Sequence, residues 1–376
     1  MSKRPPNSPS PSLSRRFVFA TVSLVILLLG LNGLVAVGEY LAYGAVSIDG
    51  KPLGLYTRKA GRNQLQPGAK LDGWLYRIHI GPMGFREPNP QLDRTDPVTR
   101  VWCFGGSTTF DIYARNDAEA WPAQMGQELQ GRFGATEVVN AGIPGELLIN
   151  NLVDLEAWGP TVRPRYVVFY QGPNELRSVL TIPGPPKSSY VPAFFAGWPL
   201  PRLLERIIPQ RAPRSLMDSP RRLSEPQRGE LRRRIDEAVN LILRVGARPV
   251  LATHALRAAP GETGETARRS VAETAGMLDL SPEGAIDAFA QYNDLLIEFS
   301  RTRGLPLADV RAAVGPEPEN WGDATHFREP GSRKAAAVVA AAIEADMASR
   351  PGEPPRGPPE GLIQDDPGLG NPGPSR

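Results

Sequence analysis

The fold that we predict is decided by the stretch VWCFGGSTT, which runs from Val101 to Thr109. A short apolar strand leads into two glycines, a serine and polar residues that can open a helix. A serine at such a junction lies on a sharp turn with its hydroxyl exposed, and the backbone N–H groups of the helix start point toward whatever that hydroxyl attacks. Because Gly-Gly-Ser-Thr also occurs in ordinary loops, the stretch indicates a nucleophile only together with motifs farther along.

From about residue 99 onward, predicted strands and helices alternate. Strands are expected at 101–104, 137–140, 165–170, 249–253 and 305–310, and helices at 120–129, 147–158, 227–244, 285–303 and 332–348. The run RYVVFY at 165–170 is typical of a strand buried on both faces. Such alternation predicts a parallel sheet with helices on both sides, whose site lies beyond the carboxyl ends of the strands.

Four polar motifs follow predicted strands in chain order. They are GGS at 105–107, NAGIPG at 140–145, QGPNE at 171–175 and DATH at 323–326. Acyl transfer needs a nucleophile, a base, a group that orients the base, and donors for the oxyanion. Ser107 can be the nucleophile and His326 the base, and Asp323 can hold the Nδ1–H of that imidazole. The oxyanion donors would be the backbone N–H groups of Ser107 and Gly145 and the side-chain amide of Asn174.

Each motif also has an ordinary structural interpretation. The glycines could form plain turns, Asn174 and Asp323 could cap helices, and His326 could be a hydrogen-bonded surface histidine. The occurrence of all four motifs in this order, each after a predicted strand, favours the catalytic interpretation.

This ordered set resembles the SGNH (GDSL-like) hydrolase superfamily, whose four sequence blocks contribute Ser, Gly, Asn and His. On that resemblance Ser107 matches the nucleophile, Gly145 and Asn174 the oxyanion donors, and Asp323 with His326 the D-x-x-H block. The match spans about residues 99–348. It implies a flavodoxin-like three-layer α/β/α sandwich. The lead-in GFR at 84–86 and the run after His326 are similar to membrane-anchored bacterial members.

Two blocks depart from the usual family pattern. The serine block reads GGST instead of GDS, and the third block reads Gly-Pro-Asn-Glu where Gly-x-Asn-Asp is usual. Asn174 is retained, but Glu175 stands in the place of an aspartate. The hydrogen bonding around Asn174 is therefore left open by the sequence.

The N-terminus carries an apolar segment long enough to span a membrane. The predicted anchor covers residues 17–38. Within it, residues 17–37 contain Asn32 as their one strongly polar side chain, and these 21 residues match a hydrocarbon core of roughly 30 Å. A secretory signal is the competing interpretation, since Ala36-Val37-Gly38 resembles a cleavage site. Lysine and arginine before the segment predict a single-pass anchor in the bacterial inner (cytoplasmic) membrane, with the catalytic domain on the periplasmic side.

The remaining boundaries follow from composition. We expect a disordered cytoplasmic tail at 1–16, an extended lead-in at 39–98 that packs on the main domain, the catalytic domain at 99–348 and a disordered tail at 349–376. A proline- and aromatic-rich insertion at 177–226 is either a surface loop or a lid over the site.

Composition also argues against several classes of function. A net charge of +3, without a basic face interleaved with aromatic residues, gives no support for nucleic-acid binding. The single cysteine, Cys103, is predicted to be buried in its strand. No cluster has the spacing of metal ligands, so we expect neither metal nor cofactor. His79 and His254 are expected to be structural, although His254 could line the cleft, and Arg232 to Arg234 to form a solvated helix face.

The sequence therefore predicts a membrane-anchored serine esterase. Its substrate would be an ester-bearing carbohydrate or lipid with short acyl or acetyl groups, cleaved through an acyl-enzyme. Two alternatives stay open, an O-acyltransferase acting on exported polysaccharide and a non-catalytic glycan-binding envelope module. The acceptor, the cleavage of the anchor and the oligomeric state are left open by the sequence.

Overall fold

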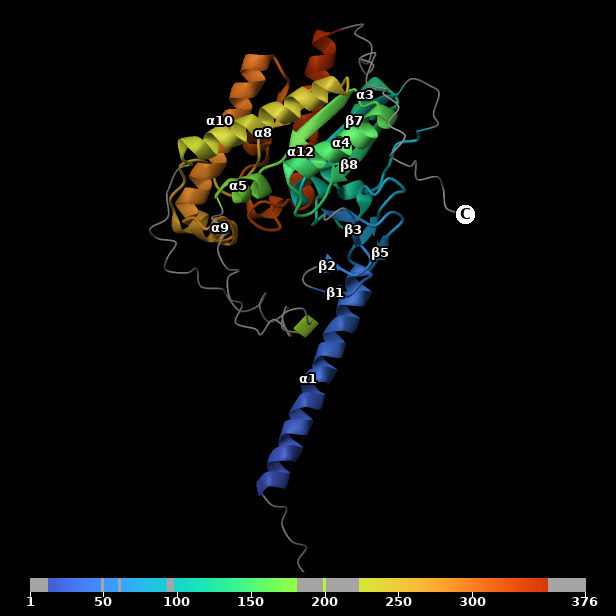
Figure 1. Cartoon of the computed structure of the whole chain (residues 1–376), viewed down its shortest axis with the longest axis vertical. Helices are drawn as coiled ribbons and strands as arrows, with labels where there is room; N and C mark the ends of the chain where they lie inside the picture. Colours follow the sequence, from blue (N-terminus) through green and yellow to red (C-terminus); the bar gives the residue numbers. More distant parts are fainter. Residues whose placement is uncertain are drawn as a thin grey trace, which may run out of the picture. The chain divides into compact units, whose positions relative to one another are not determined.

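The computed structural model describes residues 13–48, 51–59, 62–92, 98–180, 199–200 and 223–350 (Figure 1). The chain divides into two units. The first unit comprises residues 1–55, 71–76 and 186–210, and the second comprises 56–70, 77–185 and 211–376. Of the tail predicted at 349–376, residues 351–376 lie outside the described residues, whereas Ser349 is the last residue of α12 (Glu329–Ser349). Most of the insertion predicted at 177–226 also lies outside the described residues.

The first unit contains helix α1 (Leu13–Tyr43) and the two-residue strands β1 (Ser47–Ile48) and β2 (Lys51–Pro52). Among the helices of the described part, α1 is the one long and apolar enough to span a membrane by length and composition, and a signal sequence meets the same criterion. It extends beyond the predicted anchor at both ends. Gly44 ends it in the left-handed region, with φ at 75°, and the backbone N–H of Trp74 and Leu75 donate to the last-turn carbonyls of Leu41 and Ala42.

A five-stranded parallel sheet forms the centre of the second unit. Its strands are β7 (Thr99–Gly105), β8 (Thr136–Gly142), β9 (Tyr166–Tyr170), β10 (Arg248–Ala252) and β11 (Leu307–Ala308). The strand order is β11-β10-β9-β7-β8, which is the doubly wound order 2-1-3-4-5 when the five are counted along the chain. The order reverses between β7 and β9, so the chain segments that leave these two strands diverge at the switch point.

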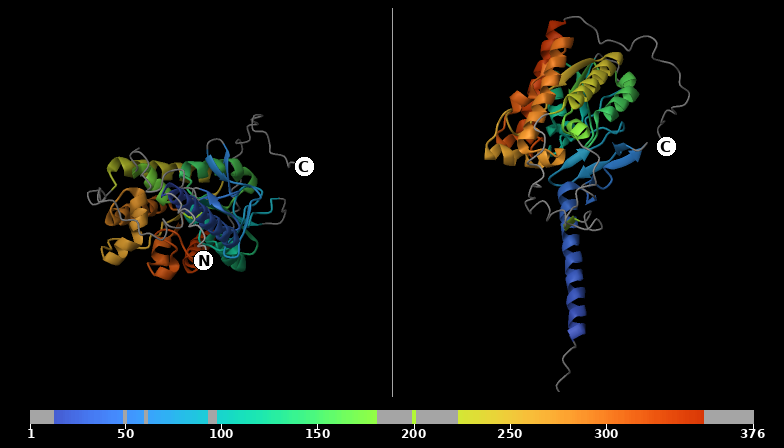
Figure 2. Two further views of the ribbon diagram at one scale, coloured as in Figure 1. Left: turned by 90° about the horizontal axis from the view of Figure 1, so that it is seen from below. Right: turned by 60° about the vertical axis from the view of Figure 1, so that its left-hand side comes forward.

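Helices cover both faces of this sheet. The described helices of the second unit are α2 (Ser107–Phe110), α3 (Trp121–Phe133), α4 (Leu148–Val162), α5 (Pro173–Leu180), α8 (Glu225–Arg244), α9 (Glu265–Leu278), α10 (Pro282–Arg303), α11 (Val310–Val314) and α12 (Glu329–Ser349), with 3₁₀ turns η1 (Asp117–Glu119) and η3 (Pro318–Asn320). Trp102 and Phe104 of β7 pack toward the core shared with α4, α8 and α10, whereas Val101 and Cys103 face α3 and α12. Alternate side chains of the strand therefore belong to two separate hydrophobic cores, one on each face of the sheet. Figure 2 shows α8 and α12 on opposite faces of the sheet.

The sandwich predicted from the sequence is confirmed, with differences in detail. Strand β11 has two residues instead of the six predicted, and α9 had not been predicted because its apolar positions are mostly alanine and glycine. All five predicted helices are present. Helices α3 and α4 begin one residue later than predicted and end four residues later, whereas α8 and α10 begin two and three residues earlier and end where predicted. Helix α12 is longer than predicted at both ends.

Short strands of the lead-in also belong to the second unit. They are β3 (Tyr56–Lys59), β4 (Arg62–Leu65), and β6 (Arg77–His79), while β5 (Lys70–Asp72) stands at the boundary. Arg62 of β4 donates to the Asp154 carboxylate of α4 at 2.9 Å, and Phe85 is buried against Trp102. Phe85, which precedes β7, thus belongs to the hydrophobic core around the sheet.

Candidate active site

The nucleophile candidate lies at the switch point of the sheet. Ser107 is the first residue of α2, directly after β7, and Gly106 precedes it as the N-cap. A Cβ on Gly106 would lie 2.6 Å from Nδ2 of Asn174, so only glycine leaves room for that amide. Thr109 donates its hydroxyl to the carbonyl of Tyr170 at 2.9 Å and thereby fixes the turn to the end of β9.

Ser107, His326 and Asp323 are brought together, although 219 residues separate the first two. Oγ of Ser107 is 2.7 Å from Nε2 of His326, and Nδ1 of His326 is 2.7 Å from Oδ2 of Asp323. The carboxylate also accepts hydrogen bonds from the backbone N–H of Thr325 and of His326, both at 2.9 Å. These bonds hold the 323–326 turn in the form that aims the imidazole at the serine.

The Asp323 carboxyl is partly buried. Burial by itself raises its pKa, but the hydrogen bonds and charge interaction with His326 and the backbone donors outweigh burial, so the pKa lies below its usual value. The group is therefore ionised at neutral pH and accepts the Nδ1–H of the imidazole. That contact sets the tautomer in which Nε2 is free to accept a proton.

The other two predicted residues, Gly145 and Asn174, lie at a second turn. Pro144 and Gly145 occupy the central positions of a turn closed by a 3.0 Å hydrogen bond from the N–H of Glu146 to the carbonyl of Ile143, and Gly145 has a φ of 82°. A proline followed by a glycine with positive φ is the signature of a type II turn. Nδ2 of Asn174 donates to the carbonyl of Glu146 at 2.9 Å, so the Asn174 amide is held against this turn.

Glu175 resolves the hydrogen bonding that the sequence left open. Its side chain is buried and caps α4, since Oε1 accepts from the backbone N–H of Leu148 at 2.6 Å. Oε2 pairs with Nη1 of Arg234 at 2.7 Å. The glutamate thus reaches two partners on different helices and locks the start of α5, where Asn174 lies.

Sequence comparison then identifies the family. The model of the GDSL-like lipase/acylhydrolase family matches residues 103–334, more than half of the chain. The chain belongs to this family. It is an SGNH serine hydrolase by membership, and the match includes Ser107, Gly145, Asn174, Asp323 and His326.

Solved structures with similar folds were also found. They include a lipase/acylhydrolase from Enterococcus faecalis (15% identity, covering 66% of this chain and 96% of that chain, TM-score 0.40). A lipolytic protein of the G-D-S-L family from Veillonella parvula DSM 2008 matches at 12% identity (67% and 99%, TM-score 0.38). An acetylxylan esterase from Geobacillus stearothermophilus, solved as a catalytic mutant, matches at 16% (65% and 94%, TM-score 0.38). Comparison with curated proteins found no match.

The other two histidines of this SGNH hydrolase have separate surroundings. His254 is fully buried and stacks on Tyr170, with ring centroids 4.8 Å apart. Burial lowers its pKa to about 3, so its ring is neutral at neutral pH. His79 contacts Asp117 through Nδ1 at 2.9 Å. Cys103 is buried as predicted, and burial raises the pKa of its thiol.

One prediction about the arginines of α8 is corrected. Arg232 and Arg233 do lie on an exposed face, paired with glutamates on the surface. Arg234 instead turns inward to Glu175 and to the hydroxyl of Ser178, at 2.6 Å. A helix places consecutive side chains about 100° apart, so one of three neighbouring arginines reaches the partly buried side.

Several polar residues around the site were not singled out from the sequence. Gln171 donates to the carbonyl of Glu146 at 3.1 Å and to Asn151, which in turn donates to the carbonyl of Gly105. The half-exposed ring of Tyr113 lies 6.1 Å from the His326 ring. Gln171 stands in a predicted motif and could have been noticed there, whereas Asn151 and Tyr113 carry no local signal.

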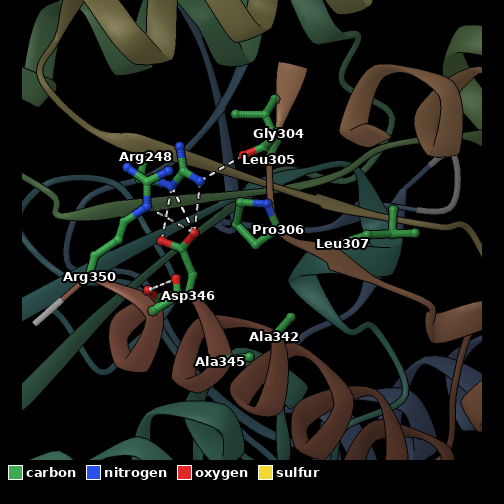
Figure 3. Close-up of a pocket in the computed structure, with 10 residues that line it drawn as sticks. Arg248, Gly304, Leu305, Pro306, Leu307, Ala342, Ala345, Asp346 and Arg350 are labelled. Atoms are coloured by element: carbon green, nitrogen blue, oxygen red, sulfur yellow. Dashed lines mark hydrogen bonds and ion pairs between the residues drawn. The ribbon is translucent and has the colours of Figure 1, made fainter. Parts of the chain in front are cut away.

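A pocket of about 340 Å³ lies away from these residues (Figure 3). It is lined by Arg248 at the start of β10, by residues 304–307 before and within β11, and by the last turns of α12. Arg248 is already paired there with Asp346 at 2.8 Å. The pocket opens at the amino end of β10, opposite the carboxyl ends that carry the site, so it is no substrate site for the serine. Among the described residues, no group of three or more His, Cys, Asp or Glu could hold a metal ion.

Proposed function

We propose that this SGNH hydrolase is a serine esterase in which Ser107, His326 and Asp323 form a catalytic triad. The observation that carries the proposal is the continuous hydrogen-bonded line from the serine hydroxyl through the imidazole to an ionised carboxylate. An imidazole held in this way is a general base for the hydroxyl that it contacts.

The reaction proceeds through an acyl-enzyme. Oγ of Ser107 attacks the ester carbonyl carbon while Nε2 of His326 takes the hydroxyl proton. The tetrahedral intermediate collapses, its C–O bond to the alcohol breaks, and His326 returns the proton to the departing alkoxide. Water then attacks the acyl-serine by the same route, and the carboxylic acid leaves with Ser107 regenerated.

We assign the negative charge of the intermediate to three donors. They are the backbone N–H groups of Ser107 and Gly145 and the second hydrogen of the Asn174 amide, whose first hydrogen is used on Glu146. Nothing but hydrogen occupies the Cβ position of Gly106 and Gly145, which leaves the substrate close access to this backbone. Donors that are already oriented stabilise the developing oxyanion without reorganisation.

The proposed substrates are short acyl esters, acetyl groups in particular, on carbohydrate or lipid of a bacterial envelope. The support is helix α1, whose first turn carries Arg15 and Arg16 just before its apolar part, which favours a single-pass anchor with the enzyme on the extracytoplasmic side. A catalytic domain held at a membrane is close to the polymers and lipids of the envelope, and ester groups on these molecules would be its substrates.

The test is hydrolysis of p-nitrophenyl acetate, butyrate and octanoate by the full-length chain in detergent, beside Ser107→Ala. Ser349→Ala is the matched control, because its hydroxyl only contacts a carbonyl of its own helix. We expect Ser107→Ala to lose a factor of about 10³ or more in kcat, with acetate as the best substrate. Equal rates in the two proteins would refute the role of Ser107, and a preference for octanoate would refute the short acyl group.

A further inference from the structure

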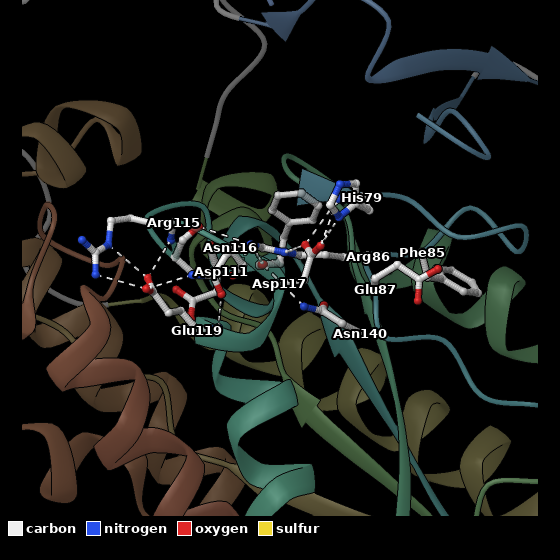
Figure 4. A network of polar contacts seen from close by, with 12 residues as sticks. His79, Phe85, Arg86, Glu87, Asp111, Arg115, Asn116, Asp117, Glu119 and Asn140 are labelled. Atoms are coloured by element: carbon white, nitrogen blue, oxygen red, sulfur yellow. Dashed lines mark hydrogen bonds and ion pairs between the residues drawn. The ribbon is translucent and has the colours of Figure 1, made fainter. Parts of the chain in front are cut away.

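Arg86 is a fully buried arginine on the segment that precedes the family match. Its guanidinium has five N–H groups, and each finds an acceptor (Figure 4). Nη1 donates to the carbonyls of Phe110 and Asp111 at 2.8 and 2.9 Å. Nη2 donates to those of Ala114 and Asn116 at 3.2 and 2.9 Å, and Nε donates to Asp117 at 3.0 Å. Burying a charge is costly unless its hydrogen bonds are satisfied, and here all five N–H groups of the guanidinium have acceptors, so Arg86 is held in one orientation.

The acceptors belong to the segment that follows the nucleophile. Phe110 is the last residue of α2, the helix that Ser107 begins, and Asp111 ends it in the left-handed region with φ at 64°. The last carbonyls of a helix have no partner within it. Arg86 binds two of them at once, and its charge also lies 5.0 Å above the Phe110 ring. Because the guanidinium fork is planar and rigid, these bonds fix the direction of the short helix.

The Asp111 side chain connects the end of α2 to helix α12, which follows His326 in the chain. Oδ2 accepts from the backbone N–H of Trp121 at 2.9 Å and from the hydroxyl of Ser332 at 2.6 Å. Ser332 lies in α12, which begins three residues after His326. One carboxylate therefore joins the end of the serine-bearing helix to the helix that follows the histidine.

We propose that Arg86 and Asp111 are positioning residues that set the distance between Ser107 and His326 without touching the substrate. The proposal rests on the triad assigned above. It means that the catalytic unit of this chain begins before the family match, because the lead-in supplies the arginine. A displacement of about 1 Å between reacting groups can cost about 100-fold in rate. Loss of the hydrogen bonds that Arg86 and Asp111 make should therefore lower kcat.

The variants to compare in the full-length protein are Arg86→Met, Arg86→Lys and Ser332→Ala, beside Ser107→Ala. Arg86→Met keeps the stem of the side chain and removes the guanidinium. Ser332→Ala removes one hydroxyl from the Asp111 carboxylate. The matched control is Arg248→Met. Arg248 is partly buried and, like Arg86, binds an aspartate and a carbonyl, but it lies at the opposite end of the sheet. The readouts are kcat, KM, melting temperature and the rate at which a fluorophosphonate labels Ser107.

We expect kcat and the labelling rate to fall about 100-fold in Arg86→Met with KM unchanged. Arg86→Lys should recover part of the loss, because an ammonium keeps the charge but reaches fewer of the five acceptors. Ser332→Ala should lower kcat in the same manner by less. Arg248→Met should lower the melting temperature and leave kcat as it is.

Wild-type kcat in a folded Arg86→Met, or in Ser332→Ala, would overturn the positioning role even if the melting temperature falls. If Arg86→Met does not fold, Arg86→Lys and Ser332→Ala decide by the same criterion. Undiminished turnover in Ser107→Ala would instead show that the proposed function is wrong, so the two failures are distinguishable.

Discussion

Gly106 offers the sharpest test of the oxyanion assignment. In Gly106→Ala the new Cβ would lie 2.6 Å from Nδ2 of Asn174 and 3.4 Å from Oε1 of Gln171. An ordinary contact begins at 3.4 Å, so the amide of Asn174 has to move by ~0.8 Å. The amide is the end of a side chain and can move at little cost in stability. As an oxyanion donor, however, it would be displaced from its position.

The expected loss in kcat is about 100-fold, the scale for a displacement of about 1 Å. Complete removal of the donor in Asn174→Ala should cost about 10²–10³. Both variants are assayed on p-nitrophenyl acetate, with Gly131→Ala as the control. A Cβ at Gly131 in α3 meets nothing within 4 Å, so that variant should keep its kcat.

The double variant separates this explanation from others. If Gly106→Ala acts through Asn174, adding it to Asn174→Ala should cost little more, because the donor is already gone. Losses that multiply would refute the reasoning, and so would a wild-type kcat in Gly106→Ala.

Two further predictions concern stability. His254 has a pKa of about 3 when folded, below its unfolded value, so its contribution is present above pH 6.5 and is lost as the pH falls toward 3. His254→Asn should flatten the fall in unfolding free energy by roughly 1 kcal/mol per pH unit between pH 6 and 4 in urea titrations, and an unchanged slope would contradict this. Glu175→Asp shortens the carboxylate so that it cannot reach both Leu148 and Arg234. It should cost about 1.5–3 kcal/mol of unfolding free energy, the scale of one charge-assisted hydrogen bond, and an unaltered urea midpoint would argue against it.

The sheet was predictable because its signals are local. Residues 101–104 and 166–170 are continuous apolar runs with glycine one or two residues after them, and such runs form buried strands wherever they occur in an alternating chain. Strand β11 is the exception. Its two residues pair only because β10 offers a free edge, so its length depends on a neighbour and not on its own sequence.

The candidate site was predictable as a set of motifs. The turns at Ser107, Gly145 and Asn174 each contain glycine or proline, and these residues favour turns wherever they stand in the sequence. The turn at 323–326 likewise closes on its own aspartate. That the turns around Ser107, Gly145 and Asn174 meet follows from the parallel sheet, because they come after β7, β8 and β9, whose carboxyl ends lie at one edge. The 323–326 turn comes after α11 and η3 and not directly after a strand, so its contact with Ser107 is set by tertiary packing.

By itself, then, the sequence determined the alternation of strands and helices and the order of the polar motifs, because periodicity and turn chemistry act over a few residues. Only the tertiary structure decided which buried polar groups meet. Nothing in the sequence distinguishes Arg86 in the lead-in, or Arg234 among three consecutive arginines. In the structure, Arg86 donates to the carbonyl of Phe110 at the end of α2, and Arg234 donates to the carboxylate of Glu175. The partners of a buried charge are set by packing between distant segments, and no local pattern encodes them.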